Sequence, residues 1–355
     1  ETPTFIISDP SPIEVSEWYP LINLYTHNDH VITKAAIRAT TSADLDTLAP
    51  ALANAFAANN DIWGLLRPLM KQEVESTEQA GTLFRGNCIA SKTLSAYCKS
   101  IGSEFLQQML RAPVTYVAEV PANYEINPAK LPSGQNIEEN IQNLREAVHF
   151  FLKNIMIALP QCPPIIRDLC HELRELVAES YPESTYTVIG GFFFLRYIGP
   201  AIVSPEGFDV VDWKIPPNAR RALVLISKVI QNIGNGVEFG KKEEYMLPLN
   251  DLIQQKIPEV HDFFDELASP TSKAAPPHVE VDDALMKKLH LHTVLIHNKI
   301  MKHISACETE MGLVNGSEMK NYSLVVDFLA QPALMDEKDY KAFKKQCKNQ
   351  QKKKH

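Results

Sequence analysis

Apolar side chains recur every three or four positions along most of the chain, which is the spacing of one face of an α-helix. A clear case follows Ser42 and Asp44, two residue types that cap the first turn of a helix. Its apolar positions are Leu45, Leu48, Leu52 and Phe56. Because the same period keeps returning, the sequence predicts an all-α protein of about a dozen helices.

Interruptions of this period divide the chain into predicted elements. Helices are expected over residues 62–70, 87–110, 133–159, 163–177, 185–198, 218–235, 252–267, 282–304 and 319–329. The stretch 185–198 is apolar on nearly every side, so we expect it to be buried at the centre of the fold. Residues 111–134 hold four prolines and little period, which predicts a long connection, extended at 114–117. Residues 241–251 predict a turn.

The composition is that of a globular protein with a large core. The chain has 355 residues, 45% of them hydrophobic and 22% charged, enough for one large or two medium domains. Its net charge of -8 does not favour nucleic acid as a partner. Residues 341–355 depart from this balance, with seven lysines and no acid. Such a run is typical of a solvated chain end, and a weak contact with an anionic membrane is the alternative.

Cysteine usage and hydropathy favour the cytoplasm. The six cysteines are scattered without close pairs, which indicates reduced thiols and neither a disulfide framework nor a zinc site. They are Cys88, Cys98, Cys162, Cys170, Cys307 and Cys347. No signal peptide and no apolar run of about 18 residues is visible, so we expect no membrane span. Because the chain starts without methionine, we expect a fragment of a longer protein.

Several chemistries have no motif in this sequence. There is no Gly-x-x-x-x-Gly-Lys-Ser/Thr loop for nucleotide, no His-Glu-x-x-His and no Gly-x-Ser-x-Gly. Four histidines lie on one predicted helix, at 290, 292, 297 and 303, without the spacing and acidic partner that a metal site needs. We expect no metal site, and surface histidines there.

Arg85 is the first candidate for function. It lies in the run Gly-Thr-Leu-Phe-Arg-Gly-Asn at 81–87, between two predicted helices. Gly86 would let the main chain pass close to a phosphate site, and Leu83 and Phe84 would anchor the loop. Taken alone, the arginine is typical of a solvated residue at the start of a helix.

Arg196 is the second candidate, because it stands in the otherwise apolar run 192–198. A charged group in such a place is rarely buried without partners. One interpretation is a structural arginine that ties carbonyls together. The other is that it fixes the loop of Arg85, in which case the carbonyls belong to residues 84–86.

The predicted helix 218–235 supplies a third segment. Lys228, Gln231 and Asn235 follow one another at i, i+3 and i+7, so they share a face. This stripe is either the solvated face of an amphipathic helix or a surface for an acidic partner.

Together these segments resemble the Ras GTPase-activating (RasGAP) domain over residues from about 60 to 265. The runs Leu-Phe-Arg-Gly-Asn at 83–87, Phe-Leu-Arg-x-x-x-Pro-Ala-Ile-Val-Ser-Pro at 194–205 and Ser-Lys at 227–228 have the order and spacing of that family. The resemblance implies an all-α fold with a central catalytic helix set and an extra helical module built from both chain ends. The implied parts are 1–58 and 286–335 for the extra module, 59–285 for the catalytic domain and 336–355 for a flexible basic tail.

The resemblance also implies roles for single residues. Arg85 matches the finger that enters the active site of a GTP-bound Ras-type GTPase, and its carbonyl steadies the catalytic glutamine of that partner. Arg196 matches the support of the finger loop, Leu195 the floor of the groove, and Lys228 a lysine that faces acidic residues of switch I. The implied GTPase-binding residues are Leu83, Phe84, Gly86, Asn87, Lys92, Leu195, Lys228, Gln231, Asn235 and Lys241.

By this resemblance GTP and magnesium belong to the partner, and the chain has no cofactor of its own. It activates hydrolysis in trans and turns over no substrate itself. Gly199 departs from the family, where many members have asparagine, and this puts the rigidity of the loop support in question. The alternatives are a scaffold that binds GTPases without hydrolysis, a class that lacks the finger arginine, and a preference for Rap over Ras.

Overall fold

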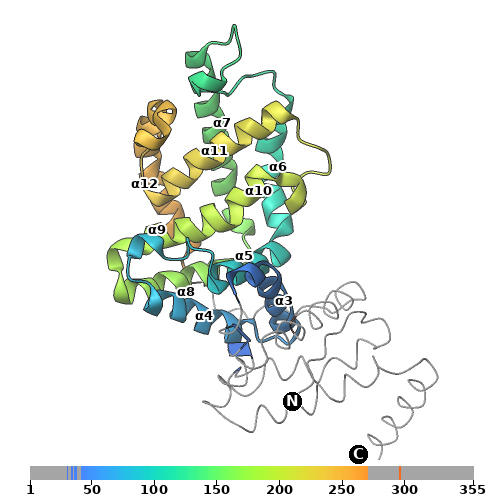
Figure 1. Cartoon of the computed structure of the whole chain (residues 1–355), viewed down its shortest axis with the longest axis vertical. Helices are drawn as coiled ribbons and strands as arrows, with labels where there is room; N and C mark the ends of the chain where they lie inside the picture. Colours follow the sequence, from blue (N-terminus) through green and yellow to red (C-terminus); the bar gives the residue numbers. More distant parts are fainter. Residues whose placement is uncertain (1–29, 31–32, 35, 38–40, 271–295, 297–355) are drawn as a thin grey trace, which may run out of the picture. The chain divides into compact units, whose positions relative to one another are not determined.

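The computed structural model describes residues 30, 33–34, 36–37, 41–270 and 296. The predicted helix 319–329, the basic tail and the four histidines lie outside the described residues, as does the predicted helix 282–304 apart from Ile296. The described residues form helices joined by turns and loops, and no strand occurs among them (Figure 1). The prediction of an all-α fold is therefore confirmed.

The chain divides into two compact units, of which one spans residues 70–277. In the other unit, the turn η3 (Ser42–Asp44) leads into α3 (Leu45–Ala58), where the apolar period predicts a helix. Helix α4 (Ile62–Ser76) begins in this unit and ends in the next one, six residues beyond its predicted end at residue 70.

The centre of the 70–277 unit is one continuous helical run of three parts. These are α9 (Thr185–Gly190), the π-helix η8 (Gly191–Ile198) and α10 (Gly199–Val203). The prediction that this helix ends before Pro200 is wrong. Pro200 instead is the second residue of α10, directly after the wider turns of the π-helix, and the helical run continues past it to Val203.

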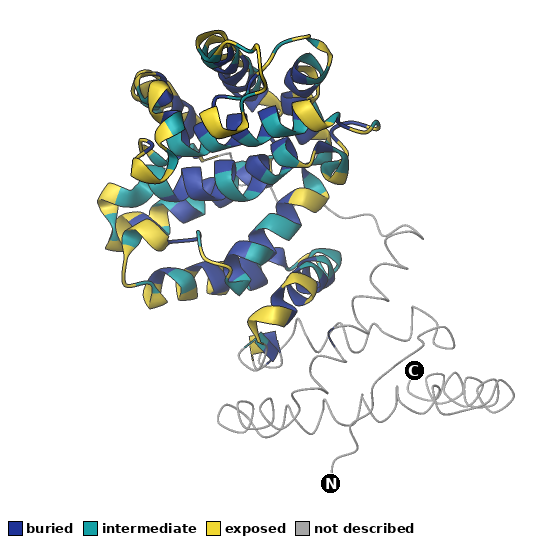
Figure 2. Ribbon diagram, turned by 45° about the horizontal axis from the view of Figure 1, so that its top comes forward, coloured by how far each residue is buried: buried dark blue, intermediate teal, exposed yellow. Residues whose placement is uncertain are grey.

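Phe192, Phe193 and Phe194 are buried in this run, and Figure 2 shows buried residues concentrated on the inner helices of the unit. The stretch Pro182–Val203 is long and apolar enough to cross a membrane by length and composition. However, 67% of its most apolar 18-residue window is buried inside the protein, so packing in the core accounts for its apolar character.

The predicted helix 87–110 is two helices, α5 (Ile89–Ile101) and α6 (Ser103–Glu119). They meet at Gly102, whose carbonyl accepts a hydrogen bond of 2.9 Å from the buried hydroxyl of Tyr197. A Cβ atom at this position would lie 2.0 Å from the same hydroxyl oxygen. The break thus depends on a tertiary contact, which the helical period does not reveal.

The predicted connection 111–134 is also wrong in its first part. Helix α6 continues to Glu119 with Pro113 inside it, and residues 114–117 are helical. A proline inside a helix costs about 3 kcal/mol. Burial of Val114 and Val117, which are 0% and 2% exposed, offsets this cost. The connection itself runs from Val120 to Asn136 and holds the short turn η5 (Pro128–Lys130).

The other predicted helices of this unit are confirmed with small changes of boundary. They are α7 (Ile137–Ile157), α8 (Pro164–Ser180), α11 (Pro217–Asn235) and α12 (Asn250–Leu267). The predicted turn at 241–251 is the 3-10 helix η10 (Lys241–Leu249), which is kinked at Glu243. Helix α11 contacts α9, η8, α10 and α12, so it crosses the central run and carries its C-terminal half towards α12 (Figure 1).

Two glycines allow the closest of these crossings. A Cβ atom on Gly190 of α9 would lie 2.0 Å from the carbonyl oxygen of Gly234 in α11. A Cβ atom on Gly234 would lie 2.3 Å from the ring of Phe194. The two helices therefore pack backbone against backbone, and this packing fixes η8 relative to α11.

Candidate arginine-loop site

The loop that carries Arg85 runs from η4 (Ala80–Thr82) to the first turn of α5. Its base is buried, because Leu83 is 1% and Phe84 0% exposed. Phe84 has a φ angle of +55°, in the left-handed region. Such a conformation costs on the order of 1–3 kcal/mol for a residue with a side chain, so its surroundings must hold it in place.

Phe84 is held from both sides by hydrogen bonds to its main chain. Its amide donates to the Oε1 atom of Glu73 on α4 at 3.2 Å. Its carbonyl accepts from the Nε atom of Arg196 at 3.3 Å. Glu73 could not be predicted, because a half-buried glutamate in a helix has no local pattern that marks this contact.

Arg196 reaches from η8 across the loop with every nitrogen of its guanidinium. Nη2 donates to the carbonyls of Arg85 and Gly86, the latter at 2.8 Å. Nη1 donates to the side-chain oxygen of Asn87 at 3.3 Å. The carbonyls that Arg196 holds are thus those of residues 84–86, the set that a loop-supporting arginine is expected to hold.

The start of α5 fixes the other end of the loop. Cys88 is the N-cap, and its Sγ atom accepts from the amide of Ser91 at 3.4 Å. The hydroxyl of Ser91 donates to the carbonyl of Gly86 at 2.7 Å, so this carbonyl has two donors. Burial raises the pKa of the Cys88 thiol, which favours its neutral form as a cap. A cysteine is a rare cap, so the sequence around Cys88 does not predict this role.

The side chain of Arg85 is half-buried. Its stem lies against η8, where a Cβ atom on Gly191 would be 3.7 Å from Cγ and 3.8 Å from Nε. The Nε and Nη2 atoms are buried, and among the described residues no acceptor lies within hydrogen-bonding distance of either. Burial lowers the pKa of this guanidinium. The site therefore offers charged donors that are shielded from water and not yet used.

Lys228, on the polar face of α11, has a partner within the chain. The resemblance implies that it faces acidic residues of another protein, and in this structure its Nζ atom is paired with Oε1 of Glu243 on η10. The hydroxyl of Tyr245 donates to the same oxygen at 3.3 Å. The kink in η10 at Glu243 brings this carboxylate back over α11, which the local sequence does not predict.

The two other residues of this stripe have different surroundings. Gln231 donates from Nε2 to the hydroxyl of Ser227 at 3.0 Å. The Oδ1 atom of Asn235 is buried, and no donor to it is found within the described part of the chain.

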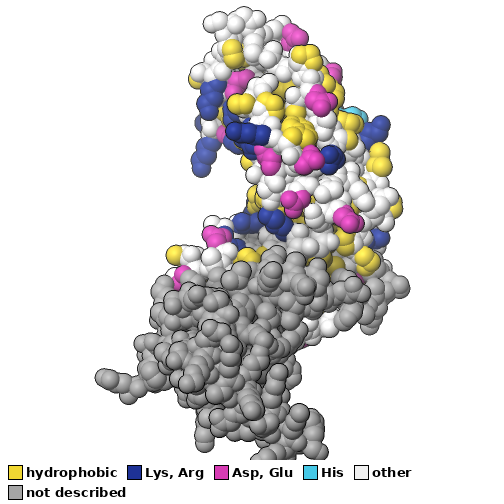
Figure 3. Space-filling model, turned by 90° about the vertical axis from the view of Figure 1, so that its right-hand side faces the viewer, with side chains coloured by type: hydrophobic (Ala, Val, Ile, Leu, Met, Phe, Trp, Pro, Cys, Tyr) yellow, Lys and Arg dark blue, Asp and Glu magenta, His cyan; other side chains and the backbone are white. Residues whose placement is uncertain are grey.

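Three further predicted residues lie on the elements around the loop. Leu195 is half-exposed beside Arg196 on η8, and Lys92 is half-exposed on α5. Lys241 is exposed at the start of η10. Since η8 contacts both α5 and α11, it links the helix that follows the arginine loop to α11, and Lys241 begins the element that follows α11. Figure 3 shows lysine and arginine side chains gathered around a hollow on one side of the described part of the chain.

Gly199 is neither flexible nor open to a side chain in this structure. Its φ and ψ angles are helical, at -55° and -48°, and its amide donates to the carbonyl of Phe194 five residues earlier. A Cβ atom there would lie 2.9 Å from Nε2 of Gln231. It would also lie 2.7 Å from the carbonyl oxygen of Phe194, so the glycine permits close packing both within this helical run and against α11.

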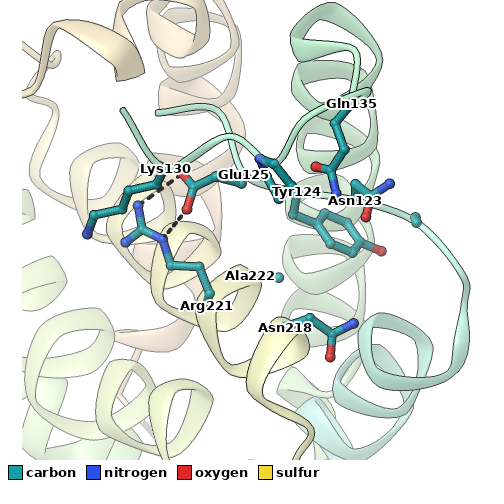
Figure 4. A pocket seen from close by; sticks show the side chains of 10 residues that line it. Asn123, Tyr124, Glu125, Lys130, Gln135, Asn218, Arg221 and Ala222 are labelled. Atoms are coloured by element: carbon teal, nitrogen blue, oxygen red, sulfur yellow. Dashed lines mark hydrogen bonds and ion pairs between the residues drawn. The ribbon is translucent and has the colours of Figure 1, made fainter. Parts of the chain in front are cut away.

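A hollow of about 200 Å³ lies at the N-terminal end of α11, between that helix and the loop after α6 (Figure 4). Its main feature is the ion pair of Arg221 with Glu125, at 2.8 Å from Nε to Oε2. The amide of Asn127 also donates to this carboxylate, at 2.9 Å. Both charges are thus satisfied within the chain, which indicates a structural pair that ties the loop to α11.

No cluster of three or more potential metal ligands occurs among the described residues. What the geometry does define is a helical domain that presents one arginine on a loop and fixes the main chain of that loop with a second arginine from a buried helix. The loop has a rigid backbone, and its first arginine has donors available to an anion brought by another molecule.

Comparison with known proteins agrees with this description. Residues 65–136 and 132–235 match the family described as GTPase-activator protein for Ras-like GTPase. Residues 65–235, a little less than half of the chain, thus match the RasGAP family.

The relatives carry names of the same kind. The chain is 29% identical over 253 residues to the probable Ras GTPase-activating-like protein ngap of Dictyostelium discoideum, covering 69% of the chain and 29% of that protein. It is 32% identical over 208 residues to human Ras GTPase-activating protein 1, covering 58% of the chain and 20% of that protein. It is 31% identical over 215 residues to rat Ras GTPase-activating protein 3, covering 59% and 26%. The chain thus spans less than a third of the length of each.

Proposed function

We propose that this chain is a GTPase-activating domain that stimulates GTP hydrolysis by a Ras-type small GTPase. The observation that carries the proposal is the contact of Arg196 with the carbonyls of residues 84–86, which fixes the backbone under Arg85. The names of the relatives support the same activity.

The chemistry follows from the charge of phosphoryl transfer. Negative charge builds on the phosphoryl oxygens and the leaving group as GTP is hydrolysed. A guanidinium inserted from a second protein neutralises this charge, and its planar fork bridges two oxygens, which an ammonium cannot do. For Ras-type GTPases as a class such an arginine contributes roughly 10³–10⁵ in rate. In this chain Arg85 is the arginine that would supply it.

The fixed backbone adds to this effect. Because Arg196, Ser91 and Glu73 hold the loop before any partner arrives, less conformational entropy is lost on docking. The carbonyl of Arg85 accepts from Arg196, and a carbonyl oxygen has a second lone pair. We propose that this lone pair accepts from the catalytic glutamine of the GTPase.

The partner in this proposal is a Ras-family GTPase in its GTP-bound state, which brings both the nucleotide and its magnesium ion. Its switch regions would dock on the face formed by Leu195, Lys228 and Asn235, with acidic residues near Lys228. Among the known members of the family we propose neurofibromin as the nearest relative, on the run Leu-Phe-Arg-Gly-Asn at 83–87. A non-catalytic scaffold is the less favoured alternative, since Arg85 is present.

Single-turnover GTP hydrolysis tests the proposal, with a panel of Ras and Rap proteins and saturating amounts of the chain. We expect Arg85→Ala to lower the stimulated rate by roughly 10²–10³, the scale of one lost charge-stabilising donor. Arg85→Lys should recover only a part of the rate. Arg111→Ala is the matched control, because Arg111 is an exposed arginine on α6 that pairs with Asp212. An unchanged rate for Arg85→Ala, or no stimulation of any GTPase, would overturn the proposal.

A further inference from the structure

The side chain of Arg85 has a defined resting place in the free protein. Its Cγ and Nε atoms are the nearest heavy atoms to the position that a Cβ atom of Gly191 would take, at 3.7 and 3.8 Å. The next is the carbonyl oxygen of Leu83, at 3.9 Å. The stem of Arg85 therefore lies flat on the backbone of η8 at a residue without a side chain.

This resting place leaves the guanidinium incompletely satisfied. Nε and Nη2 are both buried, and in the described part of the chain neither finds an acceptor. An unpaired buried donor costs about 1–3 kcal/mol, and more on a charged group. Any partner that offers oxygen acceptors nearby will therefore draw the guanidinium out of this position.

The backbone cannot follow such a movement. Arg196 holds the carbonyls of Phe84, Arg85 and Gly86, and Glu73 holds the amide of Phe84. Movement of Arg85 is thereby confined to its side-chain torsions, which change on the picosecond to nanosecond scale when they are not blocked.

The two adjacent glycines of this helix serve different contacts. Gly190 lies against the backbone of α11, where a Cβ atom would be 2.0 Å from the carbonyl oxygen of Gly234. Gly191 faces the loop, and a Cβ atom there would meet only ordinary contact distances. A methyl group at 191 thus fits, whereas a longer side chain would extend into the volume that Arg85 occupies.

We propose that Gly191 is a positioning residue for Arg85. It forms a seat on η8 where the side chain of Arg85 rests in the free protein, and which the guanidinium leaves when a docked partner supplies oxyanion acceptors. The release of the guanidinium on docking rests on the proposed function, whereas its resting place on η8 in the free protein does not.

The resting place can be tested on the isolated chain through the Nε–H group of Arg85. In protein with ¹⁵N-labelled arginine, this resonance is assigned from its loss in Arg85→Lys, and its hydrogen exchange with water is measured. We expect slow exchange in the wild type and in Gly191→Ala. Gly191→Leu should exchange roughly tenfold faster, since it fills the seat. Gly81→Ala is the control, because nothing lies within 4 Å of a Cβ atom there.

The wild-type measurement decides the proposal even if Gly191→Leu does not fold. Exchange of Arg85 Nε–H as fast as that of the exposed Arg111 would contradict a resting place of Arg85 on η8. Unchanged slow exchange in a folded Gly191→Leu would contradict it too.

In a second experiment, a Ras-type GTPase loaded with a non-hydrolysable GTP analogue is added. The Arg85 resonance should shift while that of Arg196 stays; stimulated hydrolysis without a shift of Arg85 would overturn the release. Failure of the proposed function would instead appear as no stimulated hydrolysis, with slow exchange of Arg85 retained.

Discussion

The Nε atom of Arg196 donates to the carbonyl of Phe84 at 3.3 Å and so joins two residues that lie 112 positions apart in the chain. This bond and its neighbours hold a phenylalanine in a left-handed conformation at the base of the Arg85 loop. The geometry of the loop therefore depends on residues outside it, and each of them can be removed separately.

Replacement of Arg196 should slow the stimulated hydrolysis of GTP more than it weakens binding of the chain to the GTPase. Arg196→Ala removes the hydrogen bonds that its guanidinium donates to residues 84–87 and leaves the bond from Ser91 to the carbonyl of Gly86, so the finger loses most of its backbone support, and we expect a loss of roughly 10–10² in the stimulated rate. Arg196→Lys should lose less, because one ammonium can still reach one carbonyl. Single-turnover rates at saturating and at low concentrations of the chain separate the two effects.

Arg220→Ala is a suitable control for this experiment. Arg220 pairs with Glu206 and is also partly buried, but it has no contact with the loop. It should lower the melting temperature without lowering the saturated rate. Equal rate losses for the two alanine variants would contradict a specific role of Arg196.

Glu73 should matter through its oxygen and not through its charge. It accepts from the amide of Phe84, so Glu73→Gln keeps an acceptor and Glu73→Ala does not. We expect Glu73→Ala to raise the rate of hydrogen exchange of the amides at 84–87 and to lower the stimulated rate of GTP hydrolysis. Glu73→Gln should change both rates only slightly. The exposed Glu75→Ala is the control. Equal effects of the two Glu73 variants would contradict this account.

Alanine at two adjacent glycines should have opposite consequences for stability. Gly190→Ala places a methyl group 2.0 Å from the backbone of α11, and we expect a loss of about 2–4 kcal/mol because neither backbone can move freely. Gly191→Ala meets no clash and should be neutral or stabilising by up to about 1 kcal/mol, since alanine favours a helix. Thermal unfolding of the two variants side by side measures the difference, and similar melting temperatures would argue against the close crossing.

The pairing of Lys228 with Glu243 predicts that docking must compete with an internal ion pair. Glu243→Gln should free the ammonium and speed association with a GTP-loaded GTPase, whereas Lys228→Glu should slow it. Both effects should shrink as salt is added, because exposed charges are screened. Stopped-flow association at several salt concentrations tests this, and effects that are independent of salt would count against charge complementarity at this position.

The ion pair at the N-terminal end of α11 predicts a dependence of stability on pH. Burial alone would raise the pKa of Glu125, but hydrogen bonds from Arg221 and from the amide of Asn127 outweigh it, so this pKa lies below its ordinary value of 4.5. Its stabilising contribution is therefore present above that value and is lost as the pH falls through the lowered pKa. Glu125→Gln should be less stable than the wild type at pH 7, and the difference should narrow below about pH 4. A constant difference across the titration would contradict the pair.

The helical period and the arginine motifs were enough to predict much of this molecule. The positions of α7, α8, α11 and α12 follow from apolar residues at helical spacing, and so does the burial of the central run. Arg85 and Arg196 stand out because one lies between glycines on a loop and the other in an apolar helix. Their contact could be expected from the family resemblance.

What the sequence did not reveal depends on contacts between distant segments. Gly102 ends α5 because of Tyr197, and Pro113 stays inside α6 because the residues after it are buried. Likewise, Glu73 acts on the loop through a partner eleven positions away across a turn. Local propensity carries no information on such partners, so these features needed the fold.

The π-helical form of η8 has a consequence for the length of this segment. A π-helix has one residue more in each turn than an α-helix has, and the bond from the amide of Gly199 to the carbonyl of Phe194 shows this wider turn. Each residue of an α-helix advances by about 100°, and each residue of the wider π-turn by somewhat less. Deletion of a single residue between Gly191 and Arg196 would rotate the guanidinium away from the loop carbonyls, although no contacting side chain had changed. In the course of evolution, loss of one codon in this stretch would thus remove the contact of Arg196 with the Arg85 loop as effectively as a substitution of Arg196 itself.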